Sequence, residues 1–227
     1  MKKKLIDFLL RLKYWSRDGD GYALEKYWAN RLRTFGIDSL RGVGKRSLSE
    51  EENREMYSDA KEILLDICFQ AGVDFKEMSI LDVGCGTGYY AQIVLEKNIN
   101  SRYVGIDITD VLLGELRERF PHFQFQKSDI TTKELEEDFD LIIMIDITQH
   151  IVNDDKFSFA MKNVKTHLRK GGIFIVTSWL NDQKIRSRFY EIKRPLELYE
   201  KEFPEGSYKI SEPVPFRDKF LLVIKKK

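Results

Sequence analysis

The spacing of hydrophobic positions changes about one third of the way along the chain. Up to residue 77, apolar side chains recur every three or four positions, which is typical of amphipathic helices. We expect three of them: one carrying Leu5, Leu9 and Leu12, one over 22–35 that ends at Gly36, and one from Ser49 to near Gly72. Ser49 and Glu52 have the spacing of a capping box, and residues 36–48 between the last two helices read as a loop.

From residue 79 onward, apolar runs of strand length alternate with amphipathic stretches. The expected strands are 80–83, 103–108, 123–126, 141–145 and 173–178, and the expected helices between them are about 88–97, 110–119 and 154–168. Alternating strands and helices predict an α/β fold whose parallel sheet is covered on both faces and doubly wound. Two further segments, 208–213 and 220–225, predict an antiparallel C-terminal hairpin at one edge, giving a seven-stranded, mostly parallel sheet.

Length and charge narrow the class of protein. The 227 residues are enough for one ordinary domain with an extension, and we expect a helical cap over 1–77 and a sheet domain over 78–227. Lys and Arg number 38 against 37 Asp and Glu, a net charge of +1, which argues against a general nucleic-acid binder. Cys68 and Cys85 are too few for a disulfide framework, so a reducing compartment is expected.

The N-terminus begins with a basic segment followed by apolar residues. Asp7, Arg11 and Lys13 interrupt the apolar run, so we expect neither a signal peptide nor a membrane-spanning helix, and a cytoplasmic protein without a membrane partner. The Asp-Gly-Asp-Gly segment at 18–21 is expected to be a turn or helix cap, because a calcium loop would need an oxygen ligand where Tyr22 stands.

The strongest chemical signal is the segment 80–88, Ile-Leu-Asp-Val-Gly-Cys-Gly-Thr-Gly. It joins a buried strand to a glycine-rich turn that a ligand can approach closely. A dinucleotide fingerprint would need glycine at position 89, which is Tyr89; the third glycine is Gly88 instead. An acid, Asp82, stands two residues before the first glycine.

Asp-x-Gly-x-Gly-x-Gly at the end of a first strand resembles motif I of the class I S-adenosylmethionine-dependent methyltransferases, which have a Rossmann-like fold. The resemblance extends over about 50–227, through Asp107 after the second strand, Ser128-Asp129-Ile130 after the third, the fourth strand at 139–146 and the turn at 168–174. Alone, each acid also fits a turn or cap, and a generic nucleotide-binding domain is the alternative. The agreement of several motifs with the strand pattern favours the methyltransferase.

The resemblance implies S-adenosylmethionine as cofactor and S-adenosylhomocysteine as product. It implies that Asp107 accepts hydrogen bonds from the ribose hydroxyls, and that Asp129 and the next backbone amide recognise adenine. The full set of cofactor-binding residues expected on this basis is Asp82, Gly84, Cys85, Gly86, Gly88, Asp107, Ile108, Asp129, Ile130, Ile145 and Tyr57. No metal site is expected.

Methyl transfer needs positioning above all, and a general base only for a protonated acceptor. The end of the fourth strand, where such sheets bind ligands, carries Asp146 and His150, which are the candidate catalytic residues, although a structural role for either stays open. Candidate substrate contacts are Trp179, Gln149, Tyr27 and Arg41, the last two from an aromatic and basic N-terminal region that would serve as a lid or would simply pack.

Asn-Pro-Pro-aromatic motifs and a cysteine nucleophile are missing after the fourth strand, which disfavours amino-methylation of adenine and carbon methylation of cytosine. We therefore expect a small-molecule methyl acceptor with an oxygen or nitrogen nucleophile. The alternatives are a protein or RNA methyltransferase and a non-catalytic cofactor-binding partner subunit.

Overall fold

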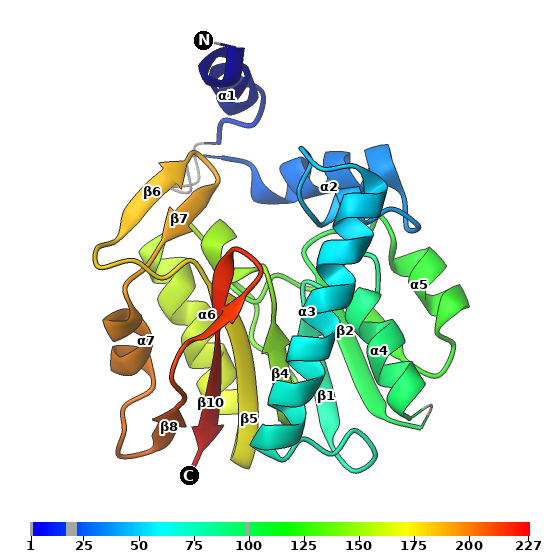
Figure 1. The fold of residues 1–227 in the computed structure, drawn as a ribbon, viewed down its shortest axis with the longest axis vertical. Coiled ribbons are helices and arrows are strands. Elements are labelled where there is room, and N and C mark those ends of the chain that lie inside the picture. The colour runs from blue at the N-terminus through cyan, green and yellow to red at the C-terminus, as the bar shows by residue number, and fades with distance from the viewer. Residues whose placement is uncertain (1, 17–21, 99) are drawn as a thin grey trace.

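A twisted sheet forms the centre of the computed structural model, which describes residues 2–16, 22–98 and 100–227, with backbone only for residues 2–7 (Figure 1). The Asp-Gly-Asp-Gly segment at 18–21 lies outside the described residues. Five strands run parallel in the order β3-β2-β1-β4-β5. They are β1 (Ser79–Val83), β2 (Arg102–Asp107), β3 (Gln124–Lys127), β4 (Phe139–Met144) and β5 (Leu168–Ser178). The predicted doubly wound α/β fold is confirmed.

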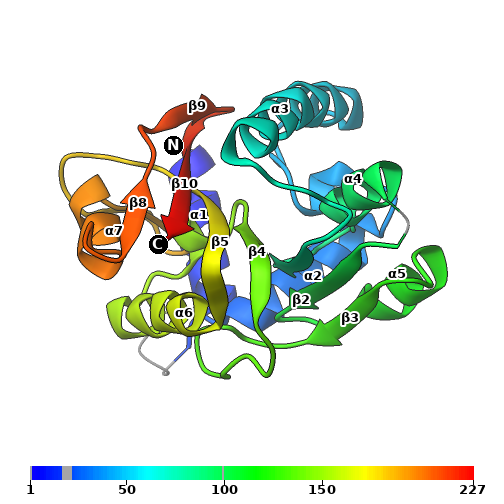
Figure 2. The same ribbon diagram turned by 90° about the horizontal axis from the view of Figure 1, so that it is seen from below.

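Helices cover both faces of this sheet (Figure 2). One face carries α3 (Glu50–Ala71), α4 (Tyr89–Lys97) and α5 (Leu113–Arg119), and the other carries α6 (Asp154–His167) and α7 (Leu196–Glu202). Alternate residues of each strand point to opposite faces, so Ile80 packs in the first core and Leu81 in the second. Because both faces are covered, every residue of β1 is buried, including the polar Ser79 and Asp82.

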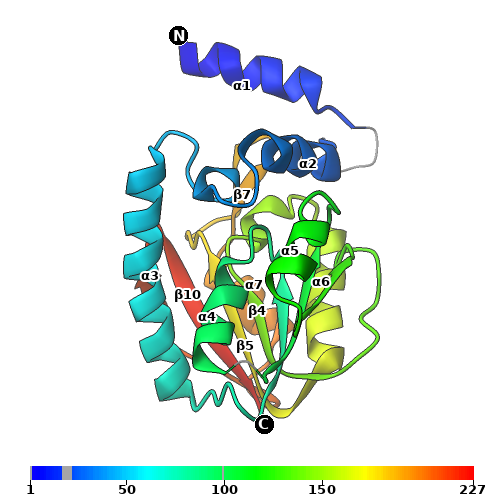
Figure 3. The ribbon, with the colours of Figure 1, turned by 90° about the vertical axis from the view of Figure 1, so that its right-hand side faces the viewer.

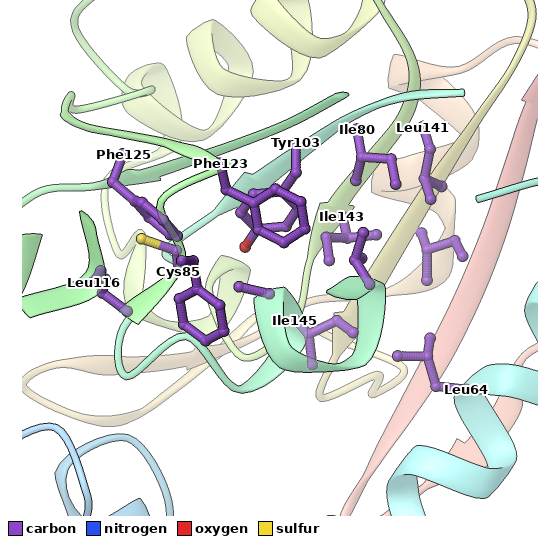
Figure 4. Packing of buried hydrophobic residues seen from close by; sticks show 14 of the residues in the cluster. Leu64, Ile80, Cys85, Tyr103, Leu116, Phe123, Phe125, Leu141, Ile143 and Ile145 are labelled. Carbon is purple, nitrogen blue, oxygen red and sulfur yellow. The ribbon is translucent and has the colours of Figure 1, made fainter. Parts of the chain in front are cut away.

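Aromatic side chains close the first core beneath the glycine turn (Figure 4). Cys85 lies among them, next to Phe125, and a Cβ added to Gly105 would lie 3.0 Å from its own Cβ. The small thiol side chain therefore fits where a larger residue would not, and its burial raises the pKa of Cys85 well above its ordinary value.

The C-terminal end of the sheet holds three antiparallel strands, which corrects the expected strand number. β8 (Tyr208–Ile210) pairs with the last residues of β10 (Lys219–Lys226), and β9 (Val214–Phe216) pairs with its first residues. β10 inserts beside β5, so the described residues form an eight-stranded sheet and not a seven-stranded one. The predicted hairpin is present, but its first arm is split in two at Ser211-Glu212-Pro213.

The N-terminal helices form a cap at one end of the sheet (Figure 3). They are α1 (Lys2–Lys13), α2 (Leu24–Phe35) and the short 3-10 helix η1 (Leu40–Gly42). Both ends of α3 lie where the local signals predict them. The capping box at Ser49 begins the helix, and Gly72, in the left-handed conformation, ends it. Leu64 of α3 packs in the same core as Ile80 of β1, so hydrophobic packing continues across the expected domain boundary at residue 77.

A small two-stranded sheet, absent from the sequence-based expectations, adjoins this cap. It consists of β6 (Ile185–Arg188) and β7 (Glu191–Lys193). The turn between them contributes Phe189 and Tyr190 to an aromatic cluster with Tyr14, Tyr22 and Tyr27 of the N-terminal region. All four residues of β6 are exposed, so β6 lacks the alternation of apolar and polar residues by which a strand is recognised in a sequence.

Candidate functional site

A cavity opens at the carboxyl ends of β1, β2 and β4, where the strand order reverses on either side of β1. Its empty space, including the open mouth, is about 940 Å³. This is the place where open α/β sheets bind ligands, because the loops after neighbouring strands diverge there. The lining includes most of the predicted cofactor residues: Gly84, Cys85, Gly86, Asp107, Ile108, Asp129, Ile130, Ile145 and Tyr57.

The glycine turn after β1 forms the floor of the cavity in a conformation that requires glycine. Gly84, Gly86 and Gly88 have φ values of 79°, 52° and 78°. A Cβ on Gly84 would lie 2.1 Å from Ile147, and a Cβ on Gly88 would lie 2.6 Å from Leu116 in the core. Gly88 does not line the cavity; it lets the chain turn directly into α4, for which it is the N-cap.

Asp107, at the end of β2, turns its carboxylate toward this floor. One oxygen accepts a hydrogen bond from the Gly86 amide at 3.1 Å, and the other accepts one from the Thr109 amide at 2.9 Å. These bonds orient the side chain and leave lone pairs on both oxygens. Burial raises the pKa of Asp107, while the two backbone hydrogen bonds act in the opposite direction.

Asp129 and Thr131 form a tight turn at the far wall of the cavity. The Asp129 carboxylate accepts from the Thr131 amide at 2.9 Å and from its hydroxyl at 2.6 Å, both on the same oxygen. The second oxygen is therefore available to a ligand. The apolar side chains of Ile108 and Ile130 flank this polar end of the cavity.

Asp82 lies outside the cavity lining, although the motif placed it among the cofactor residues. Its carboxylate is buried and accepts a hydrogen bond from the Tyr103 hydroxyl at 2.5 Å. Burial raises the pKa of Asp82 to about 7, and the Tyr103 hydrogen bond opposes that rise. A β-strand alternates its side chains between faces, so Asp82 points into the first core below the turn.

The N-terminal cap forms the roof of the cavity. Leu24, Trp28 and Leu32 of α2 line it, together with Val43. A Cβ on Gly86 would lie 2.7 Å from Val43, so roof and floor almost touch there.

The loop that carries Val43 is anchored on both sides. The buried Asn53 amide oxygen accepts from the Lys45 amide at 2.8 Å, and Glu50 accepts from the Ser39 hydroxyl at 2.7 Å and the Leu40 amide at 3.1 Å. The loop over 36–48 is thus held by side chains of α3.

Asp146, after β4, lies in a buried ionic cluster at one wall. Its carboxylate is 2.5 Å from Arg217 and 3.0 Å from Lys219, both from the β9–β10 turn and the strand that follows. Burial would raise its pKa, but the two cations hold the pKa of Asp146 well below its ordinary value. The Arg217 guanidinium also lies 4.6 Å from the centre of the Tyr57 ring, which brings α3 into the cluster.

The imidazole of His150 lines the same wall. Its Nδ1 lies 3.0 Å from the backbone oxygen of Tyr190, and because a carbonyl only accepts, Nδ1 carries the proton and Nε2 keeps its lone pair. Trp28 packs against the ring at 4.9 Å between centroids. Burial lowers the pKa of His150 to about 4, a change that the Tyr190 hydrogen bond partly offsets. The imidazole is therefore neutral at pH 7.

The four expected substrate residues lie around the cavity and do not line it. Tyr27 stacks on Tyr190 at 5.0 Å within the aromatic cluster, and Arg41 covers the Phe35 ring at 5.0 Å. Lys219 lies 4.9 Å from the centre of the Trp179 ring, and Gln149 is buried in the turn before His150.

Sequence reasoning missed several parts of the site. Arg217 and Lys219 carried no signal, because they meet Asp146 across 71 and 73 positions of the chain. Trp28 belongs to the aromatic N-terminal region, and its place on α2 is compatible with packing as well as with the roof that it forms. Over the described ranges, the structure shows no group of three or more His, Cys, Asp or Glu side chains arranged to hold a metal ion. None of the helices in those ranges has the length and apolar character needed to span a membrane.

Comparison with known proteins agrees with this geometry. A family model described as a methyltransferase domain matches residues 81–174, which include the glycine turn, Asp107, Asp129, Asp146 and His150. The malonyl-[acyl-carrier protein] O-methyltransferase of Acetivibrio thermocellus is 29% identical over 133 residues, 57% of this chain and 46% of that protein. The (S)-coclaurine N-methyltransferase of Papaver somniferum is 25% identical over 52% of this chain and 34% of its own. The chain thus aligns with less than half the length of these curated relatives.

Solved structures extend the similarity of fold to most of the chain. Magnesium protoporphyrin IX methyltransferase from Synechocystis PCC 6803 superposes with a TM-score of 0.67 over 90% of this chain and 98% of its own, at 13% identity. At that identity the likeness shows the fold alone. The family resemblance expected from the sequence motifs is confirmed.

Proposed function

We propose that this chain, whose residues 81–174 match a methyltransferase-domain model, is an S-adenosylmethionine-dependent methyltransferase acting on a small molecule. Its acceptor atom is oxygen or nitrogen. Both acceptor types occur among the similar proteins, which include the O-methyltransferase and the N-methyltransferase named above. The arrangement of the cavity supports the proposal.

The chain's own residues fit S-adenosylmethionine. Gly84 and Gly86 line the cavity and carry no side chain, so the methionine portion of the cofactor could approach the backbone of the turn closely. The oriented Asp107 carboxylate would accept the two ribose hydroxyls. Asp129, between Ile108 and Ile130, would accept the adenine amine while the two apolar side chains cover the ring faces.

The bound cofactor would supply an activated methyl group on a sulfonium, and the protein's task is then mostly positioning. The roof of Leu24, Trp28, Leu32 and Val43 excludes water from the cavity, which strengthens electrostatic interactions inside it. Holding acceptor and methyl group in line supplies most of the acceleration. Asp146, neutralised by Arg217 and Lys219, sets the charge of the wall next to the acceptor.

His150 is the group of this cavity that can take a proton from a hydroxyl or an ammonium acceptor. Its tautomer is set by the Tyr190 carbonyl, which leaves Nε2 as the basic atom, and its lowered pKa keeps it neutral throughout the physiological range. Because the pKa of His150 is about 4, proton transfer is favourable only as the acceptor loses basicity during methyl transfer.

One observation carries the proposal: two left-handed glycines, Gly84 and Gly86, and the oriented Asp107 carboxylate, which follow two neighbouring strands, meet at one cavity. Thermal melting with S-adenosylmethionine, S-adenosylhomocysteine and NAD tests it. We expect the first two ligands to raise the melting temperature and NAD to leave it unchanged. Asp107→Ala should abolish the shift, while Asp110→Ala, an exposed acid three residues later, should retain it. A shift with NAD alone refutes the assignment.

The small-molecule acceptor and the base require a transfer assay. Radiolabelled methyl transfer to fractionated cell extract should label the low-molecular-weight fraction. Label in protein or RNA would point to a macromolecular acceptor, and cofactor binding without any transfer would point to a non-catalytic partner subunit. On the labelled fraction, His150→Gln should lower kcat by about 10²-fold or more. The exposed His122→Gln is the matched control and should behave as the parent.

A further inference from the structure

The first helix presents apolar side chains on the side that faces away from the protein. Phe8, Leu9 and Leu12 of α1 are 57%, 54% and 61% exposed. Trp15, just beyond the helix, is 58% exposed. Single hydrophobic residues scattered over a surface are ordinary, but several that lie together on one helix face mark an interaction surface.

The opposite face of α1 is the one that contacts the rest of the molecule. Tyr14 is buried in the aromatic cluster, and Leu10 packs against it. The Tyr14 amide bonds the Leu10 carbonyl at 3.0 Å, so the helical path continues to Tyr14. At about 100° per residue, Phe8 and Leu12 lie on the far side from Leu10 and Tyr14. The outward stripe is therefore a separate surface from the one that attaches the helix.

Cations flank this stripe on both sides. The same helical geometry places Arg11 on one side of the apolar stripe and Lys13 on the other, and both are exposed. Lys2, Lys3 and Lys4 add three more charges to the sequence of α1, against a single acid at Asp7. The whole chain has a net charge of +1, so positive charge is concentrated on this segment.

We propose that α1 docks the protein on the surface of an anionic lipid bilayer. The helix would lie in the plane of the headgroups, with Phe8, Leu9 and Leu12 among the upper acyl chains and the flanking cations on lipid phosphates. Its 12 residues correspond to about 18 Å, too short to cross a bilayer. An exposed tryptophan next to the apolar stripe suits the interface, where amphipathic aromatic rings concentrate.

Charge complementarity selects lipid over another occupant. An apolar stripe with cations along both edges matches a surface that is apolar below and negatively charged above. A second copy of this chain would bring like charges together along those same edges, which is unfavourable. α1 lies beyond α2, at the end of the molecule opposite the C-terminus, so the bilayer would meet the cap first (Figure 3). The proposal revises the expectation of no membrane partner and is independent of methyl transfer.

Vesicle sedimentation of the full chain tests the proposal. We expect the parent to bind phosphatidylglycerol–phosphatidylcholine vesicles, to remain in solution with phosphatidylcholine alone, and to dissociate as salt is raised. Leu12→Glu should lower partitioning at least about tenfold, since it places a charge in the apolar layer. Arg11→Gln should lower it about fivefold, the equivalent of ~1 kcal/mol per cation. Phe69→Glu, on an 83% exposed residue of the last turn of α3, is the matched control and should bind as the parent.

Two results would overturn the proposal. One is a parent protein that stays in solution with both vesicle types. The other is a Leu12→Glu variant that sediments as the parent does. Light scattering distinguishes self-association from lipid docking. If the parent is a dimer, Leu12→Glu is a monomer and neither binds vesicles, the apolar stripe contacts a second copy of the chain and lipid docking is refuted. Leu12 and Phe69 are exposed, so their substitution should destabilise the protein little. Melting temperatures equal to that of the parent would show that the variants are folded.

Discussion

Replacing Asp82 by Asn should stabilise the protein at alkaline pH, even though it alters the glycine-turn motif. The carboxyl group is buried beside Tyr103, and burial raises its pKa from 3.8 to about 7. In the unfolded chain the group ionises near pH 3.8, whereas in the folded protein it stays protonated up to about pH 7. Its contribution to stability is therefore fully present below pH 3.8 and is lost as the pH rises through about 7.

The magnitude follows from the two pKa values. One pKa unit corresponds to about 1.4 kcal/mol, so the parent loses about 4 kcal/mol of stability across this window. Asn has no charge to lose, and its side-chain oxygen can still accept from the Tyr103 hydroxyl. Its amide group, buried without a partner, costs about 1–3 kcal/mol at every pH. Asp82→Asn should thus be more stable than the parent by about 1–3 kcal/mol at about pH 8, and within about 1 kcal/mol of the parent at about pH 5.

Urea unfolding at the two pH values measures this directly. The informative quantity is the change in unfolding free energy between about pH 5 and pH 8, which should shrink by about 2–3 kcal/mol in the variant. Asp110→Asn, at an exposed acid of the same region, should leave it unchanged. If parent and Asp82→Asn lose stability equally over this range, the buried carboxyl does not carry a raised pKa and the reasoning fails.

Three further predictions concern backbone strain, the ionic cluster and the imidazole. Gly88→Ala should lower the free energy of unfolding in urea by about 2 kcal/mol, because the φ of residue 88 is 78° and the added Cβ would meet Leu116 and Phe120. Gly114→Ala is the control and should not destabilise the protein, because the space around Gly114 is open. Arg217→Met alone should lower the free energy of unfolding by about 3 kcal/mol, because it leaves Asp146 without its partner, but should lower it much less when Asp146→Asn is also present. Additive effects of the two substitutions in this double-mutant cycle would contradict a direct pairing. Neutral His150 contributes stability that is present above its unfolded pKa of 6.5 and is lost as the pH falls through about 4; a His150→Gln protein that showed the same acid loss would exclude this role.

Local signals in the sequence were sufficient for most of the fold. The capping box at Ser49 and the glycines at 36 and 72 act within one helical turn, so the ends of α2 and α3 follow from neighbouring residues. The alternating strands and helices specified the parallel sheet, because strands covered by helices on both faces are mainly apolar. The division of β8 from β9 escaped prediction, since strands of three residues carry too little pattern.

The floor of the site was also readable from the sequence, since glycines and acids next to strand ends mark it locally. Its walls were not. Arg217 meets Asp146 across 71 positions, and the Tyr190 carbonyl meets His150 across 40. Asp82 shows the converse: its position in a motif suggested a ligand contact, whereas the strand's alternation directs it to Tyr103 and away from the cavity.

The sequence by itself therefore determined the sheet, the glycine turn and the acids around it, because these depend on backbone geometry within a few residues. Only the tertiary structure decided which side chains face the ligand cavity, which tautomer His150 adopts, and which face of α1 points outward. Those properties depend on contacts between segments far apart in the chain, and the packing of the whole domain sets them.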